Sequence, residues 1–142
     1  MTLDPTTAPA GTTLADLTLG EGRTAIRLTL LGQGRDLVLL VTGGEAHAGA
    51  VAVCAPAHGA RCGAYAGLCP VPGHREGPLA EEGAALLASA TGRSCVVVAG
   101  IHQDAATPEE IVAIVANARA GFSALAARLR PEPPLAGRED SA

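Results

Sequence analysis

Residues 94–110, SCVVVAGIHQDAATPEE, predict a buried strand, a short loop and the first turn of a helix. The run 95–99 is continuously apolar and rich in valine, which is typical of a central strand buried on both faces. Gly100 ends this run. Residues 107–110, TPEE, supply a capping hydroxyl, a proline in the first helical turn and a glutamate that reaches back to the cap. The loop 101–104 is therefore pinned at the mouth of the sheet, where α/β proteins usually place ligand groups. An alternative of equal weight is that residues 101–104 are only a connecting loop, whose histidine and aspartate form hydrogen bonds that stabilise the fold.

The rest of the chain adds several strands and one helix before residues 94–110, and it continues the helix that begins there. Alternating apolar residues and glycine-rich turns predict an opening antiparallel meander with strands at 14–19, 24–31, 37–41 and 50–54. Residues 55–77 are rich in Gly, Ala and Pro without periodicity, which predicts a long functional or mobile loop. Helices are expected at 79–91 and from 108 to about 129. This order predicts an α+β fold, an antiparallel or mixed sheet with two helices packed on it.

The length of 142 residues fits one domain, which we place at residues 13–130. The segments 1–12 and 131–142 are polar, lack periodicity and are expected to be disordered. The chain has no basic leader and no apolar run near the roughly 20 residues of a membrane span, so a soluble, cytoplasmic protein without a membrane partner is expected.

The composition excludes some partners. There is one Tyr, one Phe and no Trp, and the net charge is −4, which argues against a single-stranded nucleic-acid binder that stacks bases on aromatic rings. Lysine is absent, so recognition of an anion must use Arg, His or backbone N–H groups.

The four cysteines do not form a standard zinc pattern. Cys54 and Cys95 lie in apolar strands and are expected to be small core residues. Cys62 and Cys69 lie in the loop, where a disulfide between them is expected only in an oxidised preparation.

Three histidines share a position at the ends of predicted strands or just before a helix: His47, His74 and His102. If the strands 37–41 and 95–99 are neighbours, two of these histidines meet at one end of the sheet. Imidazole there, with the carboxylates of Glu45 and Asp104, suits a zinc or iron ion.

The same end of the sheet suits an anion equally well. Gly43 and Gly44 are able to adopt positive φ and to present consecutive N–H groups, and Arg75 offers a forked donor to phosphate. The sequence has no HExxH, GxSxG, GxxxxGK[ST], GxGxxG or CxxC motif, so its residues alone do not choose the ligand.

Three blocks of sequence, taken together, resemble a known family. They are VTGGEAHAGAVAV (41–53), PGHREGPLAE (72–81) and ATGRSCVVVAGIHQDAATPEEI (90–111). In this order they resemble the LpdD-like prenylated flavin chaperones, the D subunit of gallate-type UbiD-family decarboxylases, over about residues 37–129 apart from the loop 62–69. The resemblance implies an α/β sandwich of the proteasome-assembly-chaperone type. It also implies a cytoplasmic accessory protein, not an enzyme, that binds prenylated FMN (or FMN) and delivers it to the decarboxylase.

The resemblance also implies a cofactor site. Its residues in this chain are Gly43, Gly44, Glu45, His47, His74, Arg75, Glu76, Gly100, Ile101, His102 and Asp104. We assign Gly43, Gly44 and Arg75 to the phosphate, and His47, His74 and His102 to the flavin ring or to a shared divalent metal. Because aromatic residues are scarce, we expect the site at the interface of a homo-oligomer, with a flavin prenyltransferase as a further partner.

Two other functions remain open from the residues. One is a small metal-dependent enzyme that activates water with His47, His74, His102 and Asp104. The other is an assembly scaffold that binds no ligand.

Overall fold

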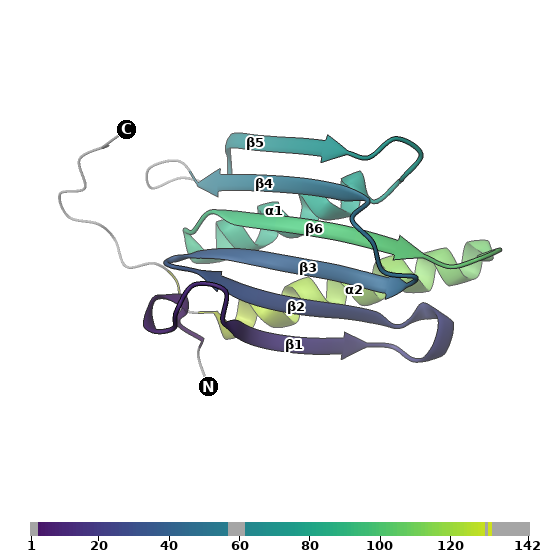
Figure 1. Ribbon diagram of the computed structural model, residues 1–142, viewed down its shortest axis with the longest axis horizontal. Helices are drawn as coiled ribbons and strands as arrows, with labels where there is room; N and C mark the ends of the chain where they lie inside the picture. Colours follow the sequence, from purple (N-terminus) through teal and green to yellow (C-terminus); the bar gives the residue numbers. More distant parts are fainter. Residues whose placement is uncertain (1–2, 57–61, 130, 132–142) are drawn as a thin grey trace.

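The protein is described here by a computed structural model that covers residues 3–56, 62–129 and 131 (Figure 1). Two helices cover one face of a six-stranded sheet with the strand order β1-β2-β3-β6-β4-β5. The elements are η1 (Pro5–Thr7), β1 (Thr13–Leu19), η2 (Gly22–Thr24), β2 (Ile26–Gln33), β3 (Asp36–Gly44), β4 (Ala50–Pro56), β5 (Cys62–Pro70), α1 (Gly77–Thr91), β6 (Cys95–His102) and α2 (Pro108–Arg128).

The position of β6 in the sheet decides where the site lies. β1, β2 and β3 form the expected antiparallel meander. β6 then lies between β3 and β4, parallel to β3 and antiparallel to β4. The register pairs Gly43 with Ile101 and Gly44 with His102, so the carboxyl ends of both strands meet at one end of the sheet. The expected neighbourhood of the two central strands is therefore confirmed.

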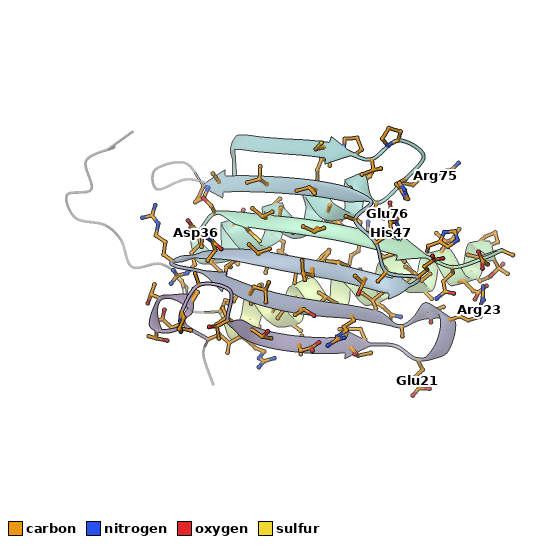
Figure 2. The ribbon with its side chains drawn as sticks, viewed as in Figure 1. Glu21, Arg23, Asp36, His47, Arg75 and Glu76 are labelled. Atoms are coloured by element: carbon orange, nitrogen blue, oxygen red, sulfur yellow. The ribbon has the colours of Figure 1, made fainter. Side chains whose placement is uncertain are left out.

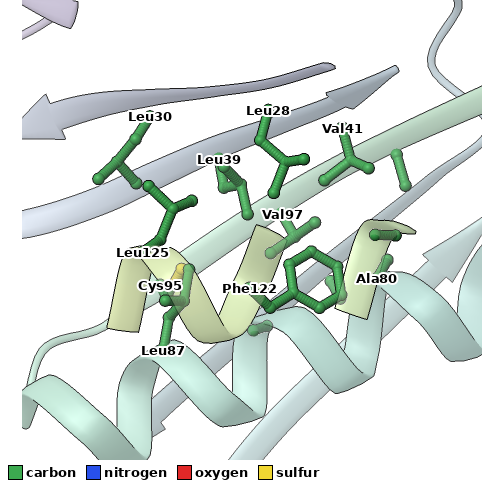
Figure 3. Packing of buried hydrophobic residues seen from close by; sticks show 14 of the residues in the cluster. Leu28, Leu30, Leu39, Val41, Ala80, Leu87, Cys95, Val97, Phe122 and Leu125 are labelled. Atoms are coloured by element: carbon green, nitrogen blue, oxygen red, sulfur yellow. The ribbon is translucent and has the colours of Figure 1, made fainter. Parts of the chain in front are cut away.

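The core lies between the sheet and the helices. Alternate residues of the central strands, among them Leu39, Val41 and Val97, are fully buried against the helices around Phe122 (Figure 3). A Cβ on Gly83 of α1 would lie 2.8 Å from the Phe122 ring, so this glycine makes room for the single phenylalanine of the chain. A core of small aliphatic residues thus packs two helices close to the sheet.

The helix predictions are confirmed. α1 ends at Gly92, which has the positive φ of 68° expected of a terminating glycine. α2 begins after Thr107 with a full capping box: Thr107 accepts from the Glu110 N–H, and the Glu110 carboxylate accepts from the Thr107 N–H.

Two strands were not predicted correctly. The segment 55–77 is not all loop, because it contains β5, which pairs antiparallel with β4 from Ala50↔Pro70 to Pro56↔Cys62. The residues of β5 do not alternate, and backbone pairing at the edge of the sheet forms the strand without that signal. The predicted loop 101–104 is also shorter, because β6 continues through His102 beside the last residues of β3.

The described part of the segment 1–12 contains η1 and contacts the end of α2. Leu3 pairs with Leu129, and its N–H donates to the Arg128 carbonyl. Asp4 accepts from the Thr6 N–H, and Pro5 is buried. Residues 132–142, the greater part of the predicted disordered tail, lie outside the described residues.

Helix α2 is long and apolar enough to cross a membrane by length and composition, which the sequence reading did not anticipate. In the structure it packs on the sheet with Ile114, Ala118, Phe122 and Leu125 buried, the arrangement of a core helix.

Of the described cysteines, Cys95 is a buried free thiol, as expected, and burial raises its pKa to about 12. Cys69 is also a free thiol and forms no disulfide. Cys54 is buried as predicted but takes part in a disulfide.

Candidate functional site

Three segments meet at the end of the sheet where β3 and β6 stop and β4 starts: residues 45–48 after β3, the segment before α1 that carries His74, and the end of β6 (Figure 2). They enclose a cavity of about 320 Å³ lined by Glu45, His47, Ala48, His74 and His102. All three histidines predicted from the sequence therefore share this cavity. Its volume is at the lower end of the roughly 300–1,000 Å³ that is usual for small-molecule sites.

His47 forms the centre of a cluster with His74 and Glu76. Its Nε2 lies 3.1 Å from His74 Nδ1 and 3.1 Å from Glu76 Oε1. The centroids of the two imidazole rings are 4.6 Å apart. On its other side His47 Nδ1 donates to the Glu45 carbonyl at 3.0 Å, which orients the ring. Residues that lie 27 and 29 positions apart in the chain thus form one polar group.

Glu76 holds a special position in this cluster. It is the residue before α1, yet its side chain makes no capping hydrogen bond to the helix. Instead, Oε1 accepts from the Ile101 N–H at 3.2 Å and the carboxylate points toward His47 (Figure 2). The side chain is only 10% exposed, and Oε2 is buried without a hydrogen-bond partner among the described residues.

His102 and Asp104 form a separate pair at the outer edge of the cavity. His102 Nε2 donates to Asp104 Oδ1 at 2.9 Å, and the Asp104 side chain is 93% exposed. Asp104 therefore does not line the cavity, whereas His102 does.

An arginine that sequence analysis did not single out pins the loop behind this pair. Arg23 of η2 donates to the Asp104 carbonyl at 2.6 Å and, through Nε, to Glu110 Oε2 at 2.8 Å. The contacts span 81 and 87 residues of sequence, and no local signal marks them.

Glycines let the segments approach one another. A Cβ on Gly100 would overlap the His47 carbonyl, and a Cβ on Gly44, which has a φ of 61°, would overlap the His102 carbonyl. A Cβ on Gly49 would contact Glu76 Oε2. Gly49 was not predicted, although glycine in the approach to a strand is a recognised sign of close backbone contact.

The residues that the sequence predicts as phosphate ligands are only partly brought together around the cavity. Gly43 and Gly44 lie in β3, paired with Ile101 and His102 of β6, and Gly44 alone of the two has positive φ. Arg75 is exposed on the loop before α1 and points away from His47 (Figure 2). Their roles toward a phosphate remain predictions.

The fold has a counterpart among solved structures. A chain from the crystal structure of a novel chaperone complex for yeast 20S proteasome assembly matches with a TM-score of 0.56 and 13% identity, over 82% of this chain and 96% of that chain. At this identity the match concerns the fold alone. It confirms the α+β fold with a proteasome-assembly-chaperone arrangement. A search of curated proteins gives no significant match.

The sequence matches one family profile, described as the prenylated flavin chaperone LpdD-like domain, over residues 20–130. The matched range contains every residue that lines the cavity and every element from η2 to α2. The chain therefore belongs to the LpdD-like family of prenylated flavin chaperones.

Proposed function

We propose that this protein binds prenylated FMN at the cavity between β3, β6 and the start of α1, and delivers it to a gallate-type UbiD-family decarboxylase. The observation that carries the proposal is the cavity itself, because its histidines come from the three segments that resemble the family. In this proposal the protein is a cytoplasmic accessory subunit that performs no catalytic step.

The cavity suits temporary holding of a cofactor. Its volume of about 320 Å³ is small for a whole flavin nucleotide, so this chain encloses part of the cofactor and another surface covers the rest. A bound ring shielded from solvent and oxygen stays reduced, and an incomplete enclosure lets the cofactor leave for the decarboxylase. A flavin prenyltransferase supplies the loaded cofactor.

We further propose that the protein is a homo-oligomer. The helices cover one face of the sheet, while the opposite face of the described sheet remains uncovered in the single chain (Figure 1). A second copy at this face would bury valine and leucine residues of the central strands.

The test replaces His102, a cavity residue whose side chain is 53% exposed, with alanine. Wild-type protein and His102→Ala are co-expressed with a flavin prenyltransferase and purified without oxygen, and the released ligand is identified by absorption and mass. Wild type should carry prenylated FMN, and His102→Ala should retain little of it while unfolding at the same temperature.

Arg119→Ala is the matched control, because Arg119 is exposed on α2 and pairs with Glu82 of α1 away from the cavity. It should retain the cofactor as wild type does. Unchanged retention by His102→Ala would show that the cavity is not the flavin site.

A metal-dependent enzyme is the second candidate, favoured by the His47, His74 and Glu76 cluster. The four residues first assigned to it do not form one group, since Asp104 pairs with His102 outside the cluster. Hydrolytic turnover that depends on added metal would support this candidate. A protein that carries neither flavin nor metal would support the third possibility, an assembly scaffold that binds no ligand.

A further inference from the structure

We propose that His47, His74 and Glu76 bind a divalent transition-metal cation of the zinc type, with a free coordination position toward the cavity. The three side chains offer donor atoms that all lie within 4.8 Å of one another. Two imidazole nitrogens and one carboxylate are a usual protein ligand set for such a site, with a fourth position left to an exogenous ligand.

The distances within the cluster fit a shared ion. His47 Nε2 lies 3.1 Å from both His74 Nδ1 and Glu76 Oε1, and His74 Nδ1 lies 3.8 Å from Glu76 Oε2. Ligands bound tetrahedrally at about 2.0–2.1 Å from zinc are separated from one another by about 3.4 Å. The observed separations bracket this value, so small side-chain adjustments bring the donors onto one ion.

The orientation of His47 presents a lone pair to the centre of the cluster. A carbonyl only accepts hydrogen bonds, so Nδ1 must carry the proton that it donates to the Glu45 carbonyl at 3.0 Å. In a neutral ring Nε2 is then an acceptor, and it faces the Glu76 carboxylate at 3.1 Å, which is also an acceptor. A cation between them resolves this conflict. A histidine that donates its other nitrogen to a backbone carbonyl is the usual supporting arrangement of a metal ligand.

Glu76 provides a second, independent observation. Its side chain is nine-tenths buried, and Oε2 has no hydrogen-bond partner in the described part of the chain. A buried carboxylate oxygen without a partner is costly, and metal coordination is one way to satisfy it. Gly49 keeps the space beside Oε2 free of a side chain.

The proposed metal ion also explains how the cavity would bind the phosphate of the cofactor, and this part of the inference rests on the proposed function. The described cavity lining contains Glu45 but no arginine, and Glu76 lies just behind it. The phosphate of a flavin nucleotide would be repelled by these carboxylates. A dication held by His47, His74 and Glu76 reverses the local charge and offers a position to the phosphate.

The first experiment measures metal binding without flavin. Protein stripped with EDTA and exchanged into metal-free buffer is titrated with Zn²⁺ and Mn²⁺ by calorimetry, and the bound metal is counted by elemental analysis. One equivalent per chain is expected, and the bound metal should raise the unfolding temperature. Glu76→Gln and His74→Ala should each weaken zinc binding by at least about tenfold.

Two features of the design keep the result interpretable. Circular dichroism shows whether each variant is folded, and the His74 side chain is 36% exposed, so a loss of binding in a folded His74→Ala variant is a loss of a ligand. Arg119→Ala is the matched control and should bind zinc as wild type does, since Arg119 pairs with Glu82 away from the cavity. Absence of metal binding, or a zinc affinity in the Glu76 and His74 variants equal to that of wild type, would overturn the site.

A second experiment measures the retention of prenylated FMN, loaded by co-expression with a flavin prenyltransferase, with and without EDTA, and it separates this inference from the proposed function. Flavin binding that weakens on metal removal supports both. Stoichiometric metal in a protein that never binds flavin rejects the proposed function and keeps the metal site. Equal flavin binding with and without EDTA, in a protein that takes up no metal, rejects the metal site and keeps the function.

Discussion

Gly100 is the residue whose replacement should disturb the cavity most directly. It lies in β6 where the strand passes the His47 backbone, and a Cβ there would overlap the His47 carbonyl. Gly100→Ala must displace the backbone that carries His47, because a carbonyl cannot rotate away as a long side chain can. We expect a loss of about 1–3 kcal/mol in the free energy of unfolding, the usual cost of overpacking, together with loss of zinc binding.

Urea unfolding of Gly100→Ala and Gly32→Ala provides the comparison. Gly32 is also in a strand, has no positive φ and would place its Cβ 3.5 Å from the nearest atom, which is ordinary contact. Gly32→Ala should therefore change the unfolding free energy by less than about 1 kcal/mol. Equal stability of the two variants would mean that the strand and the His47 segment separate easily.

The residues of the site were largely readable from the sequence, but their grouping was not. His47, His74 and Glu76 each stood beside a strand end or a helix start. Their contact depends on the 3.1 Å approach of side chains from segments far apart in the chain, which follows from the insertion of β6 between β3 and β4. The sequence interpretation chose His102 as the third metal ligand because it follows a central strand at the same end of the sheet as His47. Nothing local indicated that Glu76 points away from its own helix.

The first turn of α2 should contribute pH-dependent stability. The hydrogen bond from Arg23 is the main cause that lowers the pKa of Glu110 from its usual 4.5, and the Thr107 N–H adds to it. A carboxyl with a lowered folded-state pKa stabilises the fold above its unfolded pKa, and this contribution is lost as the pH falls through the folded-state pKa. Acid should therefore weaken the link between η2, the loop after β6 and α2.

Urea unfolding of wild type and Glu110→Gln tests this prediction. The variant should be less stable at neutral pH, and the difference should shrink as the pH falls below 4.5. Since Glu110 is solvent-accessible, high salt should also reduce the difference. Glu109→Gln, in the same helical turn, should show a smaller change with pH. A difference that stays constant down to low pH would exclude the ionised Glu110 as its source.

The elements with strong local signals were predicted, and those formed by pairing alone were not. α2 carries its proline and capping box in four consecutive residues, and α1 ends at a glycine. β5 has small residues without an alternating apolar pattern, so this strand forms because its backbone pairs with the edge of β4. The extension of β6 to His102 likewise needs the neighbouring end of β3, which no local pattern contains.

The face of the sheet opposite the helices is not covered by the described residues. The register places Leu40, Val98 and Val51 in one row across β3, β6 and β4, and Val38, Val96 and Val53 in the next row. These residues alternate with the buried core residues and therefore lie on the face opposite the helices. The sequence predicted central strands buried on both faces, yet the described residues of the chain cover only one of these faces (Figure 1).

We propose that a second copy of the chain covers this face. Six strands about 4.8 Å apart and about seven residues long span roughly 600–700 Å², close to the roughly 800 Å² that each partner buries in a standard interface. The charged residues near this apolar area, Arg27 and Asp16, are paired with each other, so two copies bring no unpaired charge together there.

Substitution of Val98 by aspartate tests the oligomer directly. Wild type should sediment as a dimer of the 14.0 kDa chain, and Val98→Asp as a monomer, because packing a second sheet would bury the unpaired carboxylate. Val51→Lys, at a residue that is already 37% exposed, repeats the test with less risk to folding. Val112→Asp, on α2 with 69% exposure, should leave the dimer intact. A monomeric wild type would reject the homodimer and turn the search for the covering surface to the decarboxylase, whose binding Val98→Asp should then abolish.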